Sequence, residues 1–173
     1  ALASFMKKEE DIDIQFISRK YEGNLNDLVT KRGFKVVQLK NYFRKSVVDH
    51  NPSIEKRWGA KFDNLLGIPQ KQDALDTISA IGASKVDWII IDHYLLDDTW
   101  KFHMKPYTNK FFEFDDLFRP TKYSNVILNQ APIKVSKENY RNKITSKTKL
   151  LLGPKYAIID ETYLNVHKNL KPH

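Results

Sequence analysis

Turn-forming residues follow four of the apolar runs in this sequence, at the points where buried strands would end, and after three of these runs their side chains are polar. Each group has an ordinary explanation, because Asp often caps the turn after a strand and Tyr packs its ring while its hydroxyl stays wet. Several such groups at one edge of a sheet would instead line a pocket for a polar ligand. The groups are Asp92-His93-Tyr94 after Ile91, Asp115-Asp116 after Phe114, Asn129-Gln130 after Leu128 and Gly153-Pro154 after Leu152.

Three kinds of chemistry fit these residue types. His93 with the Asp115-Asp116 pair offers metal ligands, although their spacing matches no known metal motif. Two carboxylates form a glycosidase pair, but adjacent aspartates cannot flank one bond, so Asp92 would have to be the partner. In the third case, which we favour, polar groups orient a bound sugar while the catalytic base comes from elsewhere. Our candidate substrate-binding residues are Asp92, His93, Tyr94, Asp116, Asn129 and Gln130.

The elements that must position these residues are strands alternating with helices. The runs at 86–91, 111–114, 126–128 and 150–152 are nearly continuous and apolar, which is typical of parallel strands buried on both faces. Intervening helices imply right-handed βαβ units. We therefore predict an α/β fold, a Rossmann-like open parallel sheet with helices on both faces. In such sheets ligands bind beyond the carboxyl ends of the strands, where the candidate residues fall.

Earlier segments extend this pattern. We predict strands at 12–17 and 34–39, a helix at 24–32 capped by Asn24 and stopped by Gly33, and an amphipathic helix at 70–83. Residues 41–68 are interrupted by Pro and Gly and predict short helices and loops. The stretch 1–8 has helical spacing of apolar residues without a cap, as in the middle of a helix.

Composition limits the classes of protein. With 173 residues, 41% of them hydrophobic and 29% charged, the chain predicts one globular domain over 1–173. The absence of cysteine excludes disulfides and thiolate metal sites and is compatible with a cytoplasmic location. No apolar run approaches the roughly 20 residues of a membrane span. The sequence contains no Walker motif, no G-x-G-x-x-G and no G-x-S-x-G.

The net charge of +8 indicates an affinity for anions such as a nucleotide diphosphate. A nucleic acid partner is not expected, because no RNP or KH signature occurs and the basic residues form no stripe. We read the densest basic run as a solvated loop: Arg141, Lys143, Lys147 and Lys149.

Short motifs give the chain a family resemblance. Asp92-His93-Tyr94-Leu95-Leu96-Asp97 with Trp100 resembles the DHY-x-LD…W signature of the pseudaminic-acid nucleotide-sugar hydrolases and related spore-coat polysaccharide proteins. Further matches follow in family order across nearly the whole chain. They are Phe16-Ile17-Ser18-Arg19 with Gly23-Asn24-Leu25, Gln72-Asp73-Ala74-Leu75-Asp76-Thr77, Asp115-Asp116-Leu117, Leu128-Asn129-Gln130, and Tyr140 followed by Leu150-Leu151-Leu152-Gly153-Pro154-Lys155-Tyr156-Ala157.

The resemblance implies two Rossmann-like domains in the glycosyltransferase-B arrangement, of which this chain would be the N-terminal one. It implies removal of UDP from UDP-2,4-diacetamido-2,4,6-trideoxy-β-L-altrose by attack of water at the anomeric carbon, in pseudaminic acid biosynthesis. No metal or other cofactor is expected. The family places the tyrosine that matches Tyr94 beside the sugar. The expected base is a histidine in a G-x-G-H turn after the first strand, where imidazole titrates near working pH.

The chain departs from that family pattern in four places. It contains no G-x-G-H, which would lie just before Ala1, and the second domain would begin near His173. Arg119-Pro120-Thr121-Lys122 stands where the family has a basic or histidine element, and Ile159-Asp160-Glu161-Thr162-Tyr163 stands for LLR-x-EF. The resemblance therefore predicts a divergent, inactive fragment, with fusion to a cytidylyltransferase as in some relatives. The alternative is a nucleotide-sugar glycosyltransferase or epimerase, since one fold serves all three.

Overall fold

The computed structural model describes residues 1–8, 12–21, 23–41, 66–131, 136–160, 162 and 163. The strands in these residues are β1 (Gln15–Arg19), β2 (Lys35–Leu39), β3 (Val86–Ile91), β4 (Thr108–Phe114), β5 (Val126–Asn129) and β6 (Lys149–Leu152). The α-helices are α1 (Leu2–Met6), α2 (Asn26–Lys31), α4 (Gln70–Ala80) and α5 (Asp98–Met104). Short 3₁₀ turns follow at Lys105–Tyr107, Lys137–Tyr140 and Pro154–Tyr156.

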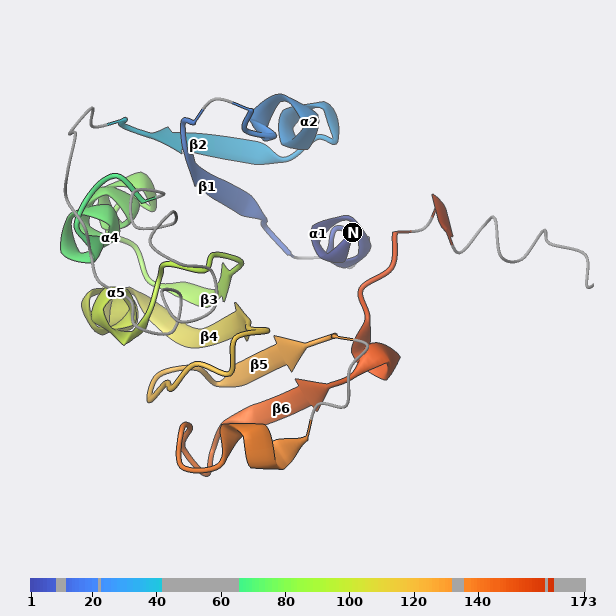
Figure 1. Cartoon of the computed structure of the whole chain (residues 1–173). Coiled ribbons are helices and arrows are strands. Elements are labelled where there is room, and N and C mark those ends of the chain that lie inside the picture. The colour runs from blue at the N-terminus through green and yellow to red at the C-terminus, as the bar shows by residue number, and fades with distance from the viewer. Residues whose placement is uncertain (9–11, 22, 42–65, 132–135, 161, 164–173) are drawn as a thin grey trace, which may run out of the picture.

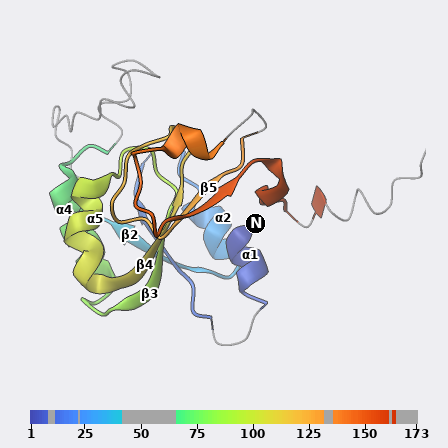
Figure 2. The same cartoon turned by 90° about the horizontal axis from the view of Figure 1, so that it is seen from below.

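All strand pairs are parallel, and they form two groups. β1 pairs with β2, while β3, β4, β5 and β6 pair in chain order. The two groups lie one above the other in Figure 1, with β1 between β2 and β3. α4 and α5 lie on one side of the strands and α1 and α2 on the other (Figure 2). The predicted α/β class with parallel strands is therefore confirmed.

The hydrophobic core lies between the β3–β4 face and the helices α4 and α5. Ile91 and Phe111 point from the strands toward Trp100 and Met104 of α5 and Ala74 of α4, and all five are at most 3% exposed. Alternate residues of a strand share a face, so the aliphatic and aromatic residues at odd positions build this layer. Each large side chain buried in this way stabilises the fold by about 1.5–3 kcal/mol.

The opposite face of β3 differs from the prediction of strands buried on both faces. Trp88 and Ile90 alternate with the buried positions and are each 42% exposed. The apolar run therefore made a strand, as predicted, but only one of its faces is covered.

Several boundaries also shift. β1 covers 15–19 instead of 12–17, and α2 begins at Asn26 because the Asn24 side chain accepts a 3.1 Å hydrogen bond from the Asn26 amide, forming a turn before the helix. α4 ends at Ala80 instead of 83, where Gly82 and Ala83 have positive φ. The helix expected within 1–8 is present as α1. Most of 41–68 lies outside the described residues. No described helix is long and apolar enough to cross a membrane.

Candidate functional site

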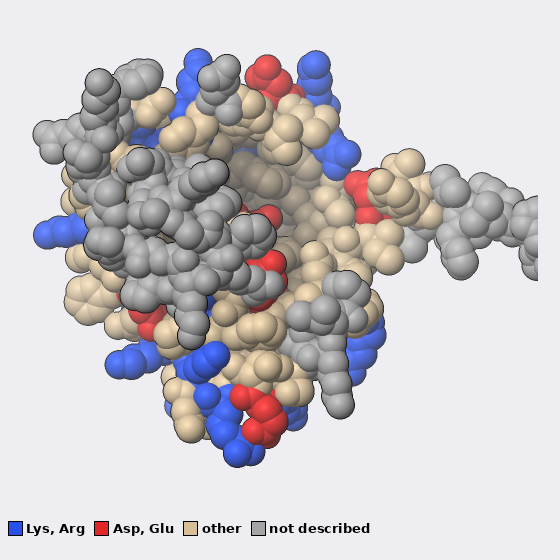
Figure 3. Space-filling view, viewed as in Figure 1, with Lys and Arg blue, Asp and Glu red and all other residues tan. Residues whose placement is uncertain are grey.

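The carboxyl ends of β3, β4 and β5 meet at one edge of the sheet. The register pairs Ile91 with Glu113 and Phe114 with Leu128, so the segments that follow these strands lie next to one another. We call these segments the rim: residues 92–94, 115–116 and 129–130. The molecular surface is hollowed between the part built on β1 and β2 and the part built on β3 to β6, and acidic side chains lie at the hollow (Figure 3).

Tyr94 and Asp116 join two neighbouring strand ends of the rim. The Tyr94 hydroxyl donates a hydrogen bond to Oδ2 of Asp116 over 3.4 Å. The Tyr94 side chain is 47% exposed, and Asp92 beside it is also exposed. This pair therefore presents an exposed hydroxyl beside a half-buried carboxylate, of which Oδ1 is turned away from solvent.

Asp115, the neighbour of Asp116, turns into the protein. Its carboxylate accepts hydrogen bonds from the backbone amides of Leu117 (3.2 Å) and Arg119 (3.0 Å) and from Nε of Arg119 (3.1 Å). Asp115 is 3% exposed. One of the two adjacent aspartates thus caps the turn after β4, as the sequence suggested for at least one of them, and the other belongs to the accessible rim.

Asn129 also turns inward. Its Nδ2 donates to the Tyr140 hydroxyl over 3.1 Å, its Oδ1 accepts from the amide of Ala131, and the residue is 1% exposed. The Tyr140 hydroxyl in turn donates to the carbonyl of Asp115. Burial raises the pKa of Tyr140 far above its usual value of 10.0, so its hydroxyl keeps its proton. The Asn129 side chain is therefore bonded to neighbouring segments inside the protein, whereas the other candidate residues lie closer to solvent.

Gln130 and His93 complete the predicted set. Gln130 is exposed, and its Oε1 accepts a 3.0 Å hydrogen bond from the amide of Ile158, beyond β6. His93 is partly buried, and its Nδ1 accepts from the amide of Leu95 over 3.1 Å, which leaves the proton on Nε2. Burial lowers the pKa of His93 below 6.5 despite the opposing effect of Asp73, so the imidazole is neutral at pH 7 and offers an N–H donor.

Sequence reasoning missed the residue that holds the rim in place. Arg119 is 4% exposed and donates to the carbonyl oxygens of Tyr94 (2.7 Å) and Leu96 (3.2 Å) and to Oε1 of Glu113 (2.8 Å). It therefore ties the loop after β3 to the strand and turn of β4. The usable signal was Glu113, a charged residue between Phe112 and Phe114 in an apolar run, because a buried carboxylate requires a cation.

The buried Glu113 carboxylate also pairs with a second cation. Nζ of Lys101, which is 1% exposed, lies 2.5 Å from Oε2 of Glu113 and 3.1 Å from the hydroxyl of Thr121. Ser124 donates to the same carboxylate oxygen over 2.6 Å. Both oxygens of Glu113 thus have partners, which come from α5, from the turn after β4 and from the segment before β5. This buried network holds the segments of the rim in place.

A separate network ties β1 to the helices. Arg19, at the carboxyl end of β1, donates to Oδ2 of Asp73 (2.7 Å) and of Asp76 (3.0 Å), and Nε1 of Trp100 donates to Oδ1 of Asp73 (2.9 Å). Arg19 and Asp73 are buried. Four residues from three of the sequence motifs, which the sequence could not place relative to one another, therefore meet in one structural cluster.

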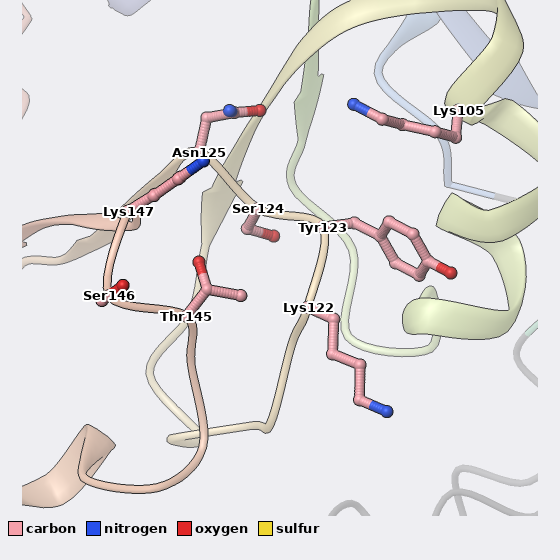
Figure 4. Close-up of a pocket in the computed structure, with 8 residues that line it drawn as sticks. All are labelled: Lys105, Lys122, Tyr123, Ser124, Asn125, Thr145, Ser146 and Lys147. Atoms are coloured by element: carbon pink, nitrogen blue, oxygen red, sulfur yellow. The ribbon is translucent and has the colours of Figure 1, made fainter.

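A pocket of about 370 Å³ lies at the other end of the strands. It is formed by the segments that precede β4, β5 and β6. The pocket therefore lies at the amino ends of the strands, whereas the rim lies at their carboxyl ends. Lys105 and Lys147 point toward Asn125, whereas Lys122 points away (Figure 4). This pocket contains none of the candidate residues. Its lining is Lys105, Lys122, Tyr123, Ser124, Asn125, Thr145, Ser146 and Lys147.

Within the described ranges, no three His, Asp or Glu side chains gather in a way that would hold a metal ion. No protein-family model matches the chain, and no curated protein matches it either.

Proposed function

We propose that the rim binds the sugar of a UDP-sugar and that the chain is the N-terminal, sugar-binding half of a hydrolase with the glycosyltransferase-B arrangement. The substrate class follows the sequence resemblance, which points to UDP-2,4-diacetamido-2,4,6-trideoxy-β-L-altrose. The observation that carries the proposal is the Tyr94–Asp116 pair, a hydroxyl and a carboxylate held together at the carboxyl edge of a parallel sheet. That edge is where α/β sheets bind ligands.

The chemistry of the rim suits an N-acetylated sugar. Such a sugar offers hydroxyl and amide N–H donors and carbonyl acceptors, and it carries no charge of its own. Asp116 and Asp92 supply acceptors, and neutral His93 supplies an N–H donor from Nε2. The Gln130 amide lies on the next strand end, where its carbonyl already contacts the amide of Ile158. Because the groups come from three strands, they would recognise the arrangement of polar groups around a ring.

In the proposed arrangement the base for water comes from outside the rim. His93 has its Nδ1 occupied by the amide of Leu95, and no G-x-G-H turn occurs in the sequence. Binding and turnover are therefore separable in this chain. We expect it to bind the sugar and to leave the bond between UDP and sugar intact, because the group that would activate water is not present.

The test is saturation-transfer NMR with the free sugar and with the UDP-sugar, combined with an assay for released UDP. We expect contacts from the sugar protons to the wild-type chain, weaker contacts in Tyr94→Phe and Asp116→Asn, and no UDP release. Ser146→Ala, in the pocket at the other end of the strands, is the matched control and should bind like the wild type. Equal binding by all variants would contradict the rim as the site, and UDP release would contradict the separation of binding from turnover.

A further inference from the structure

Three lysines from separate parts of the chain line the pocket at the amino ends of the strands. Lys105 directly follows α5, Lys122 lies before β5, and Lys147 lies before β6, within the basic run that the sequence analysis singled out. All three are exposed, and among the described residues none of them forms an ion pair. Because like charges repel, an anion bound in this pocket would be stabilised.

Asn125 adds an oriented hydrogen-bond donor to the same pocket. Its Oδ1 accepts a 2.9 Å hydrogen bond from the amide of Phe111, which fixes the side-chain amide. Within the described ranges Nδ2 donates to no protein acceptor, and Lys105 and Lys147 point toward Asn125 (Figure 4). None of the described residues that line the pocket is acidic. The pocket therefore offers donors and positive charge to a ligand that accepts.

The two segments that carry these groups are tied together. The Thr148 hydroxyl donates to the carbonyl of Ser124 over 2.9 Å and lies 3.0 Å from the hydroxyl of Thr145. The amide of Lys149 donates to the carbonyl of Asn125 over 2.8 Å. The backbone around Lys147 is therefore held beside Asn125 by the fold, without help from a ligand.

An apolar groove of about 540 Å³ continues from this pocket toward the helices. Lys105 and Tyr123 line both spaces, and Tyr123 also packs against the hydrophobic core. Phe102 and Leu75 in the groove are 61% and 47% exposed. An apolar patch of this kind beside polar groups is typical of a binding site. The apolar side chains of the groove include Leu75, Ile78, Phe102, Tyr107 and Tyr123.

We propose that the pocket and the groove together bind a small phosphate monoester with an aromatic body. The phosphate would lie between Lys105, Lys147 and Asn125, because its oxygens accept hydrogen bonds from groups that can only donate. At neutral pH a monoester carries close to two negative charges, which matches the two lysines that point toward Asn125. The aromatic ring would lie against Phe102 and Tyr123. This site is at the opposite edge of the sheet from the rim and does not rest on the proposed function.

The test is an NMR titration of the whole chain with phenyl phosphate, inorganic phosphate and phenol as separate probes. Because phenyl phosphate fills both spaces, we expect it to bind at least about tenfold more tightly than either of the other two. The largest chemical-shift changes should occur at the Asn125 side-chain amide and at the backbone amides of Ser146 and Phe102. Added salt should weaken the binding of phenyl phosphate and leave that of phenol unchanged.

Four variants separate the two parts of the site. Asn125→Asp keeps the oxygen that accepts from Phe111 and replaces the donor by a negative oxygen, so the affinity for phenyl phosphate should fall at least about tenfold. Lys147→Gln should lower it at least about threefold. Lys155→Gln removes the same charge from an exposed residue outside the pocket and is the matched control. Phe102→Ser should weaken phenyl phosphate but not inorganic phosphate.

Three outcomes would overturn the proposal. In the first, phenyl phosphate binds no more tightly than inorganic phosphate or phenol, so the pocket and the groove do not act together. In the second, Lys147→Gln loses no more affinity than Lys155→Gln, which would mean attraction by net charge alone. In the third, the chemical-shift changes fall on the rim instead of the pocket. If Asn125→Asp does not fold, Lys147→Gln and Phe102→Ser, which alter exposed side chains, still decide between these results.

Discussion

The guanidinium of Arg119 donates a 2.7 Å hydrogen bond to the carbonyl oxygen of Tyr94, twenty-five positions earlier in the chain. The same group forms ion pairs with Glu113 and Asp115, and all three charged side chains are at most 4% exposed. The position of the accessible Tyr94 side chain is therefore set by a buried network on the neighbouring strand. Rim geometry and fold stability are linked through this one residue.

Replacing Arg119 by Met should strongly destabilise the fold. The substitution leaves two buried carboxylates without one of their cations, and breaking a buried ion pair in this way costs about 3–5 kcal/mol. Urea unfolding measures the loss. The control is Arg141→Met: Arg141 pairs with Glu138, but both side chains are more than 60% exposed, so we expect at most about 0.5 kcal/mol. Similar losses for the two variants would show that the Arg119 network is not the support inferred here.

Replacing Asp115 or Asp116 by Asn should change the free energy of unfolding by very different amounts. Asp115→Asn removes a buried charge that accepts three hydrogen bonds and faces Arg119, so the free energy of unfolding should fall by about 2–4 kcal/mol. Asp116→Asn keeps the shape of a side chain on the accessible rim, and the free energy of unfolding should change by less than about 1 kcal/mol. Thermal or urea unfolding of the two variants checks this. A larger loss for Asp116→Asn would reverse the assignment of structural and rim aspartate.

Tyr140 and Tyr94 allow the same comparison between a buried group and an accessible one, here for a hydroxyl. Tyr140→Phe deletes a buried hydroxyl and leaves Nδ2 of Asn129 and the carbonyl of Asp115 each without that partner. The expected cost is about 1–3 kcal/mol. Tyr94→Phe removes a 3.4 Å contact on a side chain that is half exposed, and unfolding should change by less than about 0.5 kcal/mol. If Tyr94→Phe alone unfolded the chain, its effect on sugar binding could not be attributed to the rim.

His93 should make stability fall at acidic pH. Its folded-state pKa is lowered below 6.5, mainly by burial, while Asp73 and Asp92 raise it and Arg119 lowers it. As the pH falls, His93 is therefore protonated at a higher pH in the unfolded chain than in the folded chain. Stability is independent of this group above pH 6.5, decreases as the pH falls through the window below 6.5, and levels off under the folded-state pKa.

The measurement for His93 is the pH dependence of urea unfolding between pH 7.5 and 5. His93→Asn removes the titrating group but keeps an oxygen that accepts from the Leu95 amide. We expect the free energy of unfolding of His93→Asn to decrease less steeply with falling pH than that of the wild type. The two slopes should differ by at most about 1.4 kcal/mol per pH unit. An unchanged slope in His93→Asn would mean that other groups cause the decrease.

Local sequence was sufficient to predict where the strands form and where the polar residues that follow them lie. Val86–Ile91 formed a strand with the predicted bounds, and Asp92, Asp116 and Gln130 follow their strands at the carboxyl edge. Apolar runs of this length, with turn residues after them, determine where a chain is extended and where it turns, because both depend on neighbours within a few positions.

Tertiary structure decided which of these residues are accessible. Asp115 and Asp116 are equivalent in the sequence, and their roles separate because the turn after β4, with Phe118 at φ 56°, brings Arg119 back onto Asp115. Asn129 is buried by Tyr140, which comes from a later segment. Such partners lie far apart in the chain, and a buried charge or amide is oriented by the partner that compensates its lost hydration. The polar ends were therefore determined locally, and the rim was determined only by packing.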